Sequence, residues 1–402
     1  MRQPVDVAEG LRLIPWFHMG GTLSGPLVES SIVRILVCPD SFTGTLSAAE
    51  AADAIAAGWR RTAPDDDLVL RPLSDGGPGF LDAVASGVDA QRRTVRVRGP
   101  LGDRVDADYL LDVNGTAWIE SATAAGLHLV PPDRRDPTRT STFGVGELIA
   151  DSLAAEAGRI VVGVGGTGTS DGGAGMLAAL GAHAQSGELT AGGGGLGEVT
   201  GLDLVPALDG VRGVRLEVAT DVDVPLLGSR GAARGFARQK GASDEQVVQL
   251  EESLRLWAHQ LGRTDAGLSP AVALGAGAGG GLGAGLIRLG ATRVPGIATV
   301  LAAAGIDSLL ADPDRPVQLA ITGEGSFDWQ SLQGKVVAGV AAAALARAIP
   351  VLVLAGRVEI TRREWMRSGV AAAFPAAAGP GQTPTDGLSA AAERAARTWS
   401  PR

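Results

Sequence analysis

Two short apolar runs near the start of the chain flank a helical pattern. Residues 32–38 form an apolar run without alternation, as expected of a strand that is buried on both faces, and residues 68–73 are typical of a second strand. Between them, Ser47 is followed three residues later by Glu50, a capping box that predicts a helix ending at about residue 61. A strand, a helix and a second strand in this order predict a parallel sheet.

The pattern changes after residue 90, where strand-like segments are separated by glycine-containing turns. Residues 94–98, 105–111 and 116–119 are typical of strands, and Asn114-Gly115 before the third is a two-residue hairpin signal. They predict an antiparallel meander and therefore a second subdomain with a mixed sheet. Further strands are expected at residues 159–164 and 214–219, and helices near residues 146–157, 172–180 and 244–261.

The first kind of pattern returns near the end of the chain. Apolar runs at residues 317–321 and 350–354 flank a helical segment at residues 335–348. The simplest topology is an α/β fold with a discontinuous, doubly wound (Rossmann-like) parallel-sheet domain and an inserted mixed-sheet α/β domain. The boundaries we expect are 32–90 and 290–402 for the discontinuous domain and 91–289 for the insertion.

Length and composition are those of a soluble globular protein. The 402 residues can form two domains, with 45% hydrophobic and 20% charged residues. A net charge of −9 without basic runs argues against nucleic acid as a partner. The sequence contains no apolar stretch long enough to span a membrane, so we expect a cytoplasmic protein. The oligomeric state stays open, with a homodimer as one candidate.

Two segments invite a functional interpretation but have a simpler one. Residues 1–31 contain a short apolar piece flanked by acids, which is a poor signal peptide. We interpret them as a disordered extension, with Met19 as an alternative start. The single cysteine, Cys38, lies in an apolar run and is typical of a buried small hydrophobe rather than a catalytic thiol.

The loops after the predicted strands are the candidate site, because ligands of doubly wound sheets bind beyond the carboxyl ends of the strands. These loops are residues 39–41, 74–77, 163–173, 220–223 and 322–328. A lone acid in a loop is usually solvated or turn-forming. Here every loop contains a carboxylate, which favours a functional cluster.

The longest of these loops begins with GVGGTG at residues 163–168. It matches the dinucleotide fingerprint, but no strand ending in an acid follows at the required distance, which disfavours NAD. Thr169, Ser170 and Asp171 then open a helix through two glycines. Hydroxyls, backbone N–H groups and a helix N-terminus form an anion site. A glycine-rich turn capped by Asp171 is the alternative.

Lysine is rare in this chain. Among 35 Lys and Arg residues only Lys240 and Lys335 are lysines, and each lies beside a glycine, although chance retention is an alternative. P-loop, protein-kinase and H-E-x-x-H motifs are absent from the sequence. Two amines, glycine-rich loops and loop carboxylates fit phosphoryl transfer, which needs donors on the phosphates, Mg²⁺ ligands and a proton acceptor.

Several segments together resemble those of one known family. They are PDSFTGTL (39–46), DGGPGF (75–80), the stretch 119–149, GVGGTGTSDGGAGM (163–176), DVDVPLLG (221–228), FARQKGA (236–242), GAGAGGGLGAGL (275–286) and TGEGSFDWQSLQGK (322–335). In this order they resemble the type I glycerate kinase family over about residues 34–355. The resemblance implies an ATP-dependent kinase that converts D-glycerate to phosphoglycerate, most often the 2-phosphate, in an interdomain cleft.

The resemblance carries over residue by residue. The cleft residues that it implies are Asp40, Asp75, Asp171, Asp221, Glu324 and Asp328, with Lys240 and Lys335. The chain departs from the family at Thr43 (usually lysine), Pro78 (usually glutamate), Ser170 (usually asparagine) and Ser326 (often arginine). Loss of two cations would affect affinity or substrate choice unless another arginine replaces them; the candidates are Arg71, Arg234 and Arg238.

The chemistry then assigns expected roles. Asp171 or Asp75 is the base that deprotonates the substrate hydroxyl, and Lys335 neutralises phosphate charge during catalysis. The expected substrate- and phosphate-binding residues are Asp40, Ser41, Gly76, Gly77, Gly165, Gly166, Thr169, Ser170, Lys240 and Gly323. Mg²⁺ is expected on Asp221 with Asp223 or Glu324. Two alternatives remain: a kinase for a related small hydroxy acid, and a non-catalytic ligand-binding protein on the same fold.

Overall fold

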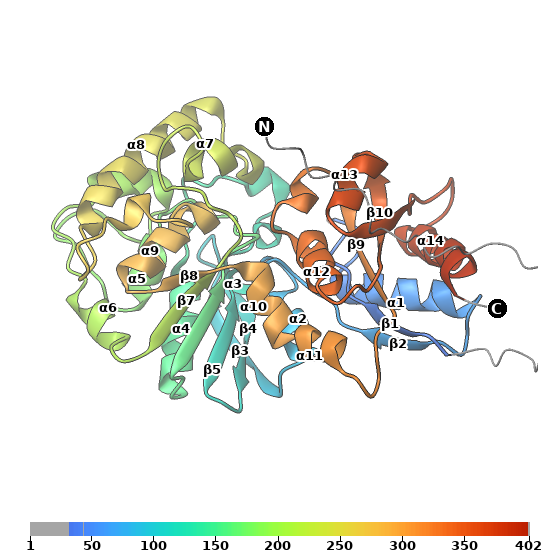
Figure 1. Ribbon diagram of the computed structural model, residues 1–402. Coiled ribbons are helices and arrows are strands. Elements are labelled where there is room, and N and C mark those ends of the chain that lie inside the picture. The colour runs from blue at the N-terminus through green and yellow to red at the C-terminus, as the bar shows by residue number, and fades with distance from the viewer. Residues whose placement is uncertain (1–31, 43, 401–402) are drawn as a thin grey trace, which may run out of the picture. The chain divides into compact units, whose positions relative to one another are not determined.

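The computed structural model describes residues 32–42 and 44–400, so the predicted N-terminal extension and the Thr43 departure lie outside the described residues. Two sheets organise this part of the chain (Figure 1). The first has the strand order β11-β10-β9-β1-β2, and all of its neighbouring strands are parallel. Its strands are β1 (Arg34–Val37), β2 (Asp67–Leu70), β9 (Leu319–Phe327), β10 (Val351–Val358) and β11 (Val370–Pro375).

Helices cover both faces of this parallel sheet. Ile35 and Val37 of β1 share a core with α1 (Ala48–Arg60) and α14 (Pro384–Trp399). Leu36, which points the other way, shares a core with α12 (Val336–Leu345). Helix α13 (Arg362–Arg367) contacts β11, and helices α10 (Gly296–Ala303) and α11 (Ile306–Ala311) pack beside α12. Helix α2 (Phe80–Ala85) packs on α10. The prediction of a sheet with helices on both faces is therefore confirmed.

Local sequence signals explain where two of these helices begin. The predicted capping box is present, because the Glu50 N–H donates to the Ser47 side chain while the Glu50 carboxylate accepts from the Ser47 N–H. Lys335, the predicted first residue of the next helix, is its N-cap, and α12 begins one residue later.

Strand β9 is longer than the apolar run predicts. The sequence places a loop at residues 322–328, whereas the structure continues the strand to Phe327 and pairs it with β10 as far as Val358. That expectation was wrong because glycine lets the two backbones approach closely. A Cβ on Gly323 would lie 2.2 Å from the carbonyl oxygen of Leu354. Glu324 therefore projects from a strand and not from a loop.

The second sheet is mixed, in the order β3-β4-β5-β6-β7-β8. β3, β4 and β5 are antiparallel neighbours, and β5 to β8 are parallel. The bounds are β3 (Ala90–Arg98), β4 (Arg104–Asp112), β5 (Thr116–Glu120), β6 (Arg159–Gly163), β7 (Arg215–Ala219) and β8 (Thr292–Val294). The predicted turn at Asn114-Gly115 joins β4 to β5, with Gly115 at φ 74°.

Seven α-helices among the described residues accompany this sheet. They are α3 (Ser121–Ala125), α4 (Phe143–Ala154), α5 (Ala174–Ala179), α6 (Val205–Gly210), α7 (Ala232–Phe236), α8 (Asp244–Leu261) and α9 (Leu282–Arg288). The 3₁₀ turns are η1 (Leu127–Leu129), η2 (Pro132–Arg134), η3 (Gly193–Glu198), η4 (Arg238–Lys240), η5 (Pro270–Val272), η6 (Ala278–Gly281) and η7 (Gln330–Leu332). α8 has the predicted bounds and begins at the capping residue Ser243.

Side chains from both sheets share one hydrophobic core. Leu36 and Ala320 of the parallel sheet belong to the same buried cluster as Leu110, Trp118 and Val161 of the mixed sheet. Helix α10 contributes Val300 to this cluster. The loops that follow strands of the two sheets are therefore attached to the same core. Within the described residues, no helix is long and apolar enough to cross a membrane.

Candidate functional site

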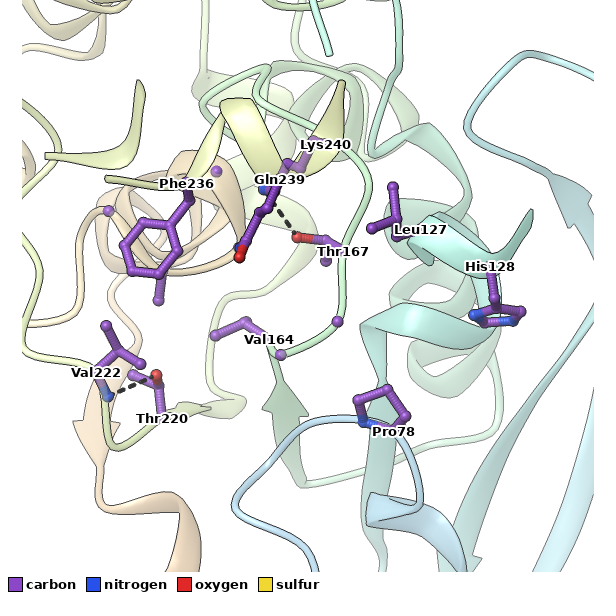
Figure 2. A pocket seen from close by; sticks show the side chains of 16 residues that line it. Pro78, Leu127, His128, Val164, Thr167, Thr220, Val222, Phe236, Gln239 and Lys240 are labelled. Atoms are coloured by element: carbon purple, nitrogen blue, oxygen red, sulfur yellow. Dashed lines mark hydrogen bonds between the residues drawn. The ribbon is translucent and has the colours of Figure 1, made fainter. Parts of the chain in front are cut away.

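A cavity of about 430 Å³ lies beside the mixed sheet. Its walls are Pro78, Leu127, His128, Val164, Gly165, Gly166, Thr167, Thr220, Val222, Phe236, Gln239, Lys240, Gly277, Ala278, Gly279 and Gly280. Figure 2 shows Phe236, Val222 and Thr220 on one side and Leu127, His128 and Pro78 on the other. The loop after β6, with Val164 and Thr167, runs between these two sides.

Lys240 supplies the cationic group of the cavity. It ends the 3₁₀ turn η4, and its Nζ donates to the carbonyl oxygen of Thr169 at 2.6 Å and to Thr167 Oγ1 at 3.5 Å. Burial lowers the pKa of Lys240 to about 8, against the opposing effect of Asp171. Space for the amine depends on Gly280, whose added Cβ would lie 2.9 Å from Nζ and 2.0 Å from the Thr169 oxygen.

Asp171 organises the glycine-rich loop from inside the protein. Its side chain is fully buried. Oδ2 accepts from Thr142 N at 2.7 Å, Thr142 Oγ1 at 2.9 Å and Gly175 N at 3.2 Å, and Oδ1 accepts from Gly173 N at 3.2 Å. Burial raises the pKa of Asp171, and these hydrogen bonds oppose that effect. A carboxylate so enclosed holds the loop against α5 and leaves little room for a substrate hydroxyl.

Thr169 and Ser170, two residues of the predicted anion site, are also buried inside this loop. Neither lines the cavity, and their hydroxyl oxygens make no hydrogen bond in the structure. Gly165 and Gly166 do line it, with Gly166 in the left-handed region at φ 73°. An added Cβ on Gly166 would lie 2.7 Å from the Pro78 ring. The residue that departs from the family at position 78 is thus a wall of the cavity.

Four carboxylates form a second feature next to this cavity. Asp40 follows β1, Asp75 follows β2 after the intervening residues 71–74, Asp221 follows β7, and Glu324 lies within β9. Burial raises the pKa values of Asp40, Asp221 and Glu324, and charge repulsion from Asp75 adds to the rise in all three, so Asp75 is their common neighbour. We call these four residues the carboxylate cluster. The structure thus brings together four acids that the sequence assigns to one site.

The pKa values within the carboxylate cluster are displaced toward neutrality. Burial first, and then Asp75, raises the pKa of Asp40 to about 7. Burial raises the pKa of Glu324 to about 7 and that of Asp221 to about 6. Lys335 acts in the opposite direction on Asp40 and Glu324. Burial is therefore the main reason that these carboxylates leave their usual pKa range, and Lys335 offsets it only in part.

The cavity and the carboxylate cluster share their walls. The N–H of Gly165 donates to the Gly76 carbonyl oxygen at 3.0 Å, and an added Cβ on Gly165 would lie 2.5 Å from Gly77 Cα. On the other side, Thr220 and Val222 line the cavity and flank Asp221 in the chain. Gly76 is left-handed at φ 97°, which only glycine adopts readily.

Two further contacts shape the loops of the carboxylate cluster. Ser41 donates its N–H to Asp40 Oδ1 at 2.6 Å, so this predicted binding residue first fixes its neighbour. Glu120, at the end of β5, accepts from Gly79 N at 3.1 Å and Leu81 N at 3.3 Å. Burial raises the pKa of Glu120 to about 7. Glu120 thereby anchors the loop that carries Asp75, a role that sequence reasoning missed.

The predicted metal ligands are brought together only in part. Asp221 and Glu324 belong to the carboxylate cluster, whereas Asp223 is exposed and forms an ion pair with Arg293 at 2.7 Å. Among the described residues, no three His, Cys, Asp or Glu side chains form a ready-made metal site. Mg²⁺ commonly uses one or two carboxylates together with substrate phosphates, so pairs within the cluster suit it. Oε1 of Glu324 is buried without a hydrogen-bond partner, which fits a ligand atom.

Two of the arginines proposed to replace missing cations are occupied elsewhere. Arg238 Nε pairs with Asp244 at 2.8 Å and Arg234 lies 3.9 Å from Glu251. Ser326 is the register partner of Arg357 in the β9–β10 pair, and Arg357 itself lies 3.5 Å from Glu359. Arg357 was not singled out from the sequence, because its strand partner depends on β9 continuing beyond residue 321.

Sequence reasoning also missed the apolar walls of the cavity. Phe236 and Gln239 lie in the segment FARQKGA that carries Lys240, and Val222 lies between the two aspartates of the motif DVDV. Their proximity in sequence to residues already chosen was a signal that could have found them. Leu127 and His128 gave no such signal, because only the fold brings η1 to the glycine-rich loop.

Comparisons with known proteins cover nearly the whole described chain. The profile of the glycerate kinase family matches residues 35–400. A glycerate kinase of Halalkalibacterium halodurans is 41% identical over 345 residues, which are 85% of this chain and 90% of that protein. Glycerate 2-kinase of Escherichia coli K12 is 38% identical over 337 residues, covering 81% and 85% respectively.

A solved structure is similar as well. It is the crystal structure of a Salmonella typhimurium LT2 protein provisionally named glycerate kinase 2, with 37% sequence identity and a TM-score of 0.75. The match covers 91% of this chain and 98% of that one. Sequence and fold therefore point to the same family.

Proposed function

Because the chain belongs to the glycerate kinase family, a family of enzymes, we propose that it transfers the γ-phosphoryl group of ATP to D-glycerate. The observation that carries this proposal is the carboxylate cluster with Lys335, which adjoins a cavity containing the buried cation Lys240. Phosphoryl transfer needs these components: cationic and amide donors for phosphate oxygens, carboxylates for Mg²⁺ and one proton acceptor. The 2-phosphate is the product we expect, by analogy with the relative named glycerate 2-kinase.

We assign the proton acceptor to Asp75, one of the two aspartates that the sequence left open. Asp75 is partly exposed and central to the carboxylate cluster, whereas the oxygens of Asp171 already accept hydrogen bonds from buried donors. Asp75 would take the proton of the substrate hydroxyl while that oxygen bonds to the γ-phosphorus and the bond to the leaving ADP oxygen breaks. Asp171 acts as a positioning residue for the loop and for Lys240.

The remaining residues bind the two substrates and neutralise the charge of the phosphates. Lys335 and Lys240 face the phosphate charge, and Asp40, Ser41, Gly76, Gly77 and Gly323 frame the glycerate. Gly165 and Gly166 present backbone to the phosphates, while Thr169 and Ser170 support that loop from inside. Asp221 and Glu324 would hold Mg²⁺, which when bound neutralises charge on the phosphate oxygens. Asp223 takes part only if its pair with Arg293 opens.

The architecture suits this assignment. We propose that residues 91–289 form an inserted domain and that the site occupies a cleft between it and the parallel-sheet domain. The cytoplasm, where ATP is abundant, is the compartment that we propose. A homodimer is compatible with these roles, which do not depend on it.

The test is direct. Purified protein with ATP, Mg²⁺ and D-glycerate should release ADP in a coupled assay, and phosphorus NMR of the product should show a 2-phosphate. Absence of ADP release across Mg²⁺ concentrations at neutral pH would contradict the proposal. A 3-phosphate resonance would leave the kinase assignment in place and correct its regiochemistry.

A second candidate is a kinase for a related hydroxy acid, and Ser326 is the observation that favours it. Ser326 replaces a frequent arginine, and Arg357 on the neighbouring strand is the nearest replacement that the strand register offers. A panel of hydroxy acids with and without a 3-hydroxyl separates the two candidates. A higher kcat/KM for another acid than for D-glycerate would favour the second.

A further inference from the structure

We propose that the cavity of about 430 Å³ binds the nucleoside part of ATP, with the purine ring stacked on Phe236 and its edge read by Gln239. This inference rests on the proposed kinase function and deepens it. It assigns the two adjoining features to different substrates: the cavity to the nucleotide, and the carboxylate cluster to glycerate and the reacting phosphoryl group.

The size and lining of the cavity favour a nucleoside over a three-carbon acid. Its volume lies in the range of pockets that enclose molecules much larger than glycerate. The side chains that form its walls are mostly apolar: Pro78, Leu127, Val164, Val222, Phe236 and Ala278. Glycerate carries a carboxylate and two hydroxyls and would leave this apolar surface unused, whereas a purine and a ribose would cover it.

Phe236 provides an aromatic face at one side of the cavity. It is the last residue of α7 and is partly buried, and Figure 2 shows its ring directed into the cavity. The helix below it is fixed, because Ala232, Ala233 and Ala237 are fully buried in the core that includes α8. A ring held on a rigid support loses little freedom when a base stacks on it.

Gln239 and Thr220 supply polar groups next to that face. A carboxamide carries both a donor and an acceptor, the combination that pairs with adjacent ring nitrogen and amino groups of adenine. Figure 2 shows the Gln239 side chain extending into the cavity between Phe236 and Thr167. Thr220 Oγ1 accepts from the Val222 N–H at 3.2 Å and keeps its own hydroxyl proton to donate.

The position of the cavity also determines the direction in which the phosphates of a bound ATP would extend. From Phe236 the chain of phosphates would pass Lys240 and the backbone of Gly165 and Gly166. Gly165 abuts Gly77, and Thr220 is followed at once by Asp221, so the same walls lead to the carboxylate cluster. ATP whose nucleoside lies at the Phe236 side would thus direct its terminal phosphate toward Asp75, without a second pocket.

The first experiment compares two aromatic residues. Phe236→Ala should raise KM for ATP about tenfold or more, as expected for loss of a stacked base, and leave KM for D-glycerate within about twofold. Trp329→Ala is the matched control, since Trp329 is a large aromatic side chain that is 60% exposed and does not line the cavity. Its KM for ATP should change less than about twofold. The reverse result, with Trp329→Ala impaired and Phe236→Ala normal, would overturn the proposal.

Direct binding makes the test independent of turnover. Adenosine, which has no phosphates, should bind the full-length protein in calorimetry and compete with ADP but not with D-glycerate. Phe236→Leu, which keeps apolar volume without a ring face, should weaken adenosine binding and separates stacking from folding. Competition between adenosine and D-glycerate, or equal adenosine affinity in both Phe236 variants and the natural protein, would refute the assignment.

The preference of the enzyme for ATP over GTP tests whether Gln239 recognises the base. Gln239→Glu removes the amide donor and should lower the ratio of kcat/KM for ATP over GTP by about tenfold. An unchanged ratio would exclude base reading by Gln239. A protein that binds adenosine through Phe236 but never phosphorylates glycerate would uphold the cavity assignment and reject the proposed function, so the two failures are distinguishable.

Discussion

Asp75 and Asp171 both follow strands, yet their surroundings differ. Asp75 is partly exposed and faces three other carboxylates, whereas Asp171 is enclosed by four hydrogen-bond donors from Thr142, Gly173 and Gly175. An exposed carboxylate in a like-charged cluster can accept a proton from a substrate. An enclosed one contributes by accepting bonds that the backbone would otherwise lose. The two residues should therefore respond differently to the same substitution.

Asp75→Asn should lower kcat about 10²- to 10⁴-fold, the usual contribution of a general base, with little change in thermal midpoint. Asp171→Asn should instead destabilise the fold, because an amide cannot accept from all the N–H and O–H groups that face it. Each buried donor left unsatisfied costs about 1–3 kcal/mol of the free energy of unfolding. Stopped assays and thermal melts of both variants measure the contrast.

Equal losses of kcat with unchanged melting in the two variants would instead place Asp171 in the reaction. Loss of stability in Asp75→Asn would assign that residue a structural role. The two variants can be compared directly, because each replaces one carboxylate oxygen by an amide nitrogen and changes nothing else. A difference between them therefore comes from the surroundings of the residue.

At the scale of elements, the sequence predicted most of the secondary structure that carries the site. Lys335 precedes a helix and Asp40 follows a strand as expected, since apolar runs and capping residues are local signals. The end of β9 could not be predicted, because Gly323 reads as a loop residue unless the neighbouring Leu354 is known. Likewise Leu127 reaches the cavity only through the isolated bridge from Gly126 to Thr167.

Strand β9 gives the prediction that belongs to this scale. Gly323→Ala would insert a Cβ 2.2 Å from the Leu354 oxygen, so β9 and β10 must separate where Glu324 begins to project. We expect a lower thermal midpoint and a lower kcat together, because the strand pair sets the position of Glu324. Thermal melts and initial rates of the purified variant measure both quantities.

Gly210→Ala serves as the matched control. Gly210 ends α6, has nothing within 4 Å of an added Cβ, and needs no left-handed backbone. It should be neutral or slightly more stable, as usual for glycine to alanine at a compatible position. A Gly323→Ala protein with the stability and rate of this control would show that the β9–β10 contact does not position the site.

For the whole molecule, buried charge makes stability depend on pH in a defined direction. Burial raises the pKa values of Asp40 and Glu324 to about 7, so the folded protein binds protons there that the unfolded chain releases at lower pH. The stabilisation is complete only below about pH 4, where these carboxyls are protonated in the unfolded chain as well, and it is lost progressively as the pH rises through about 7. The pKa of Lys240 is lowered to about 8, so this buried amine is still charged at pH 7. Its deprotonation therefore does not offset the loss of stability until the pH rises above about 8.

Replacement of Asp40 or Glu324 should therefore stabilise the ligand-free protein more at pH 8 than at pH 5.5. For Asp40→Asn we expect a thermal midpoint above that of the natural chain by on the order of 2 °C at pH 8, with a clearly smaller difference at pH 5.5. Asp265→Asn, at an exposed loop position, should show no such pH dependence. Differential scanning fluorimetry across this range measures the three proteins side by side.

The effect of Mg²⁺ on the thermal midpoint should also depend on pH. A cation that binds ionised carboxylates binds the folded protein more tightly at pH 8 than at pH 5.5 and raises the midpoint by mass action. Asp40→Asn and Glu324→Gln should both reduce that rise. If Mg²⁺ shifts the midpoint equally at both pH values, or equally in the variants, then the carboxylate cluster neither holds the cation nor limits stability. The balance of charge around Asp75 would then have to be set by groups outside the cluster.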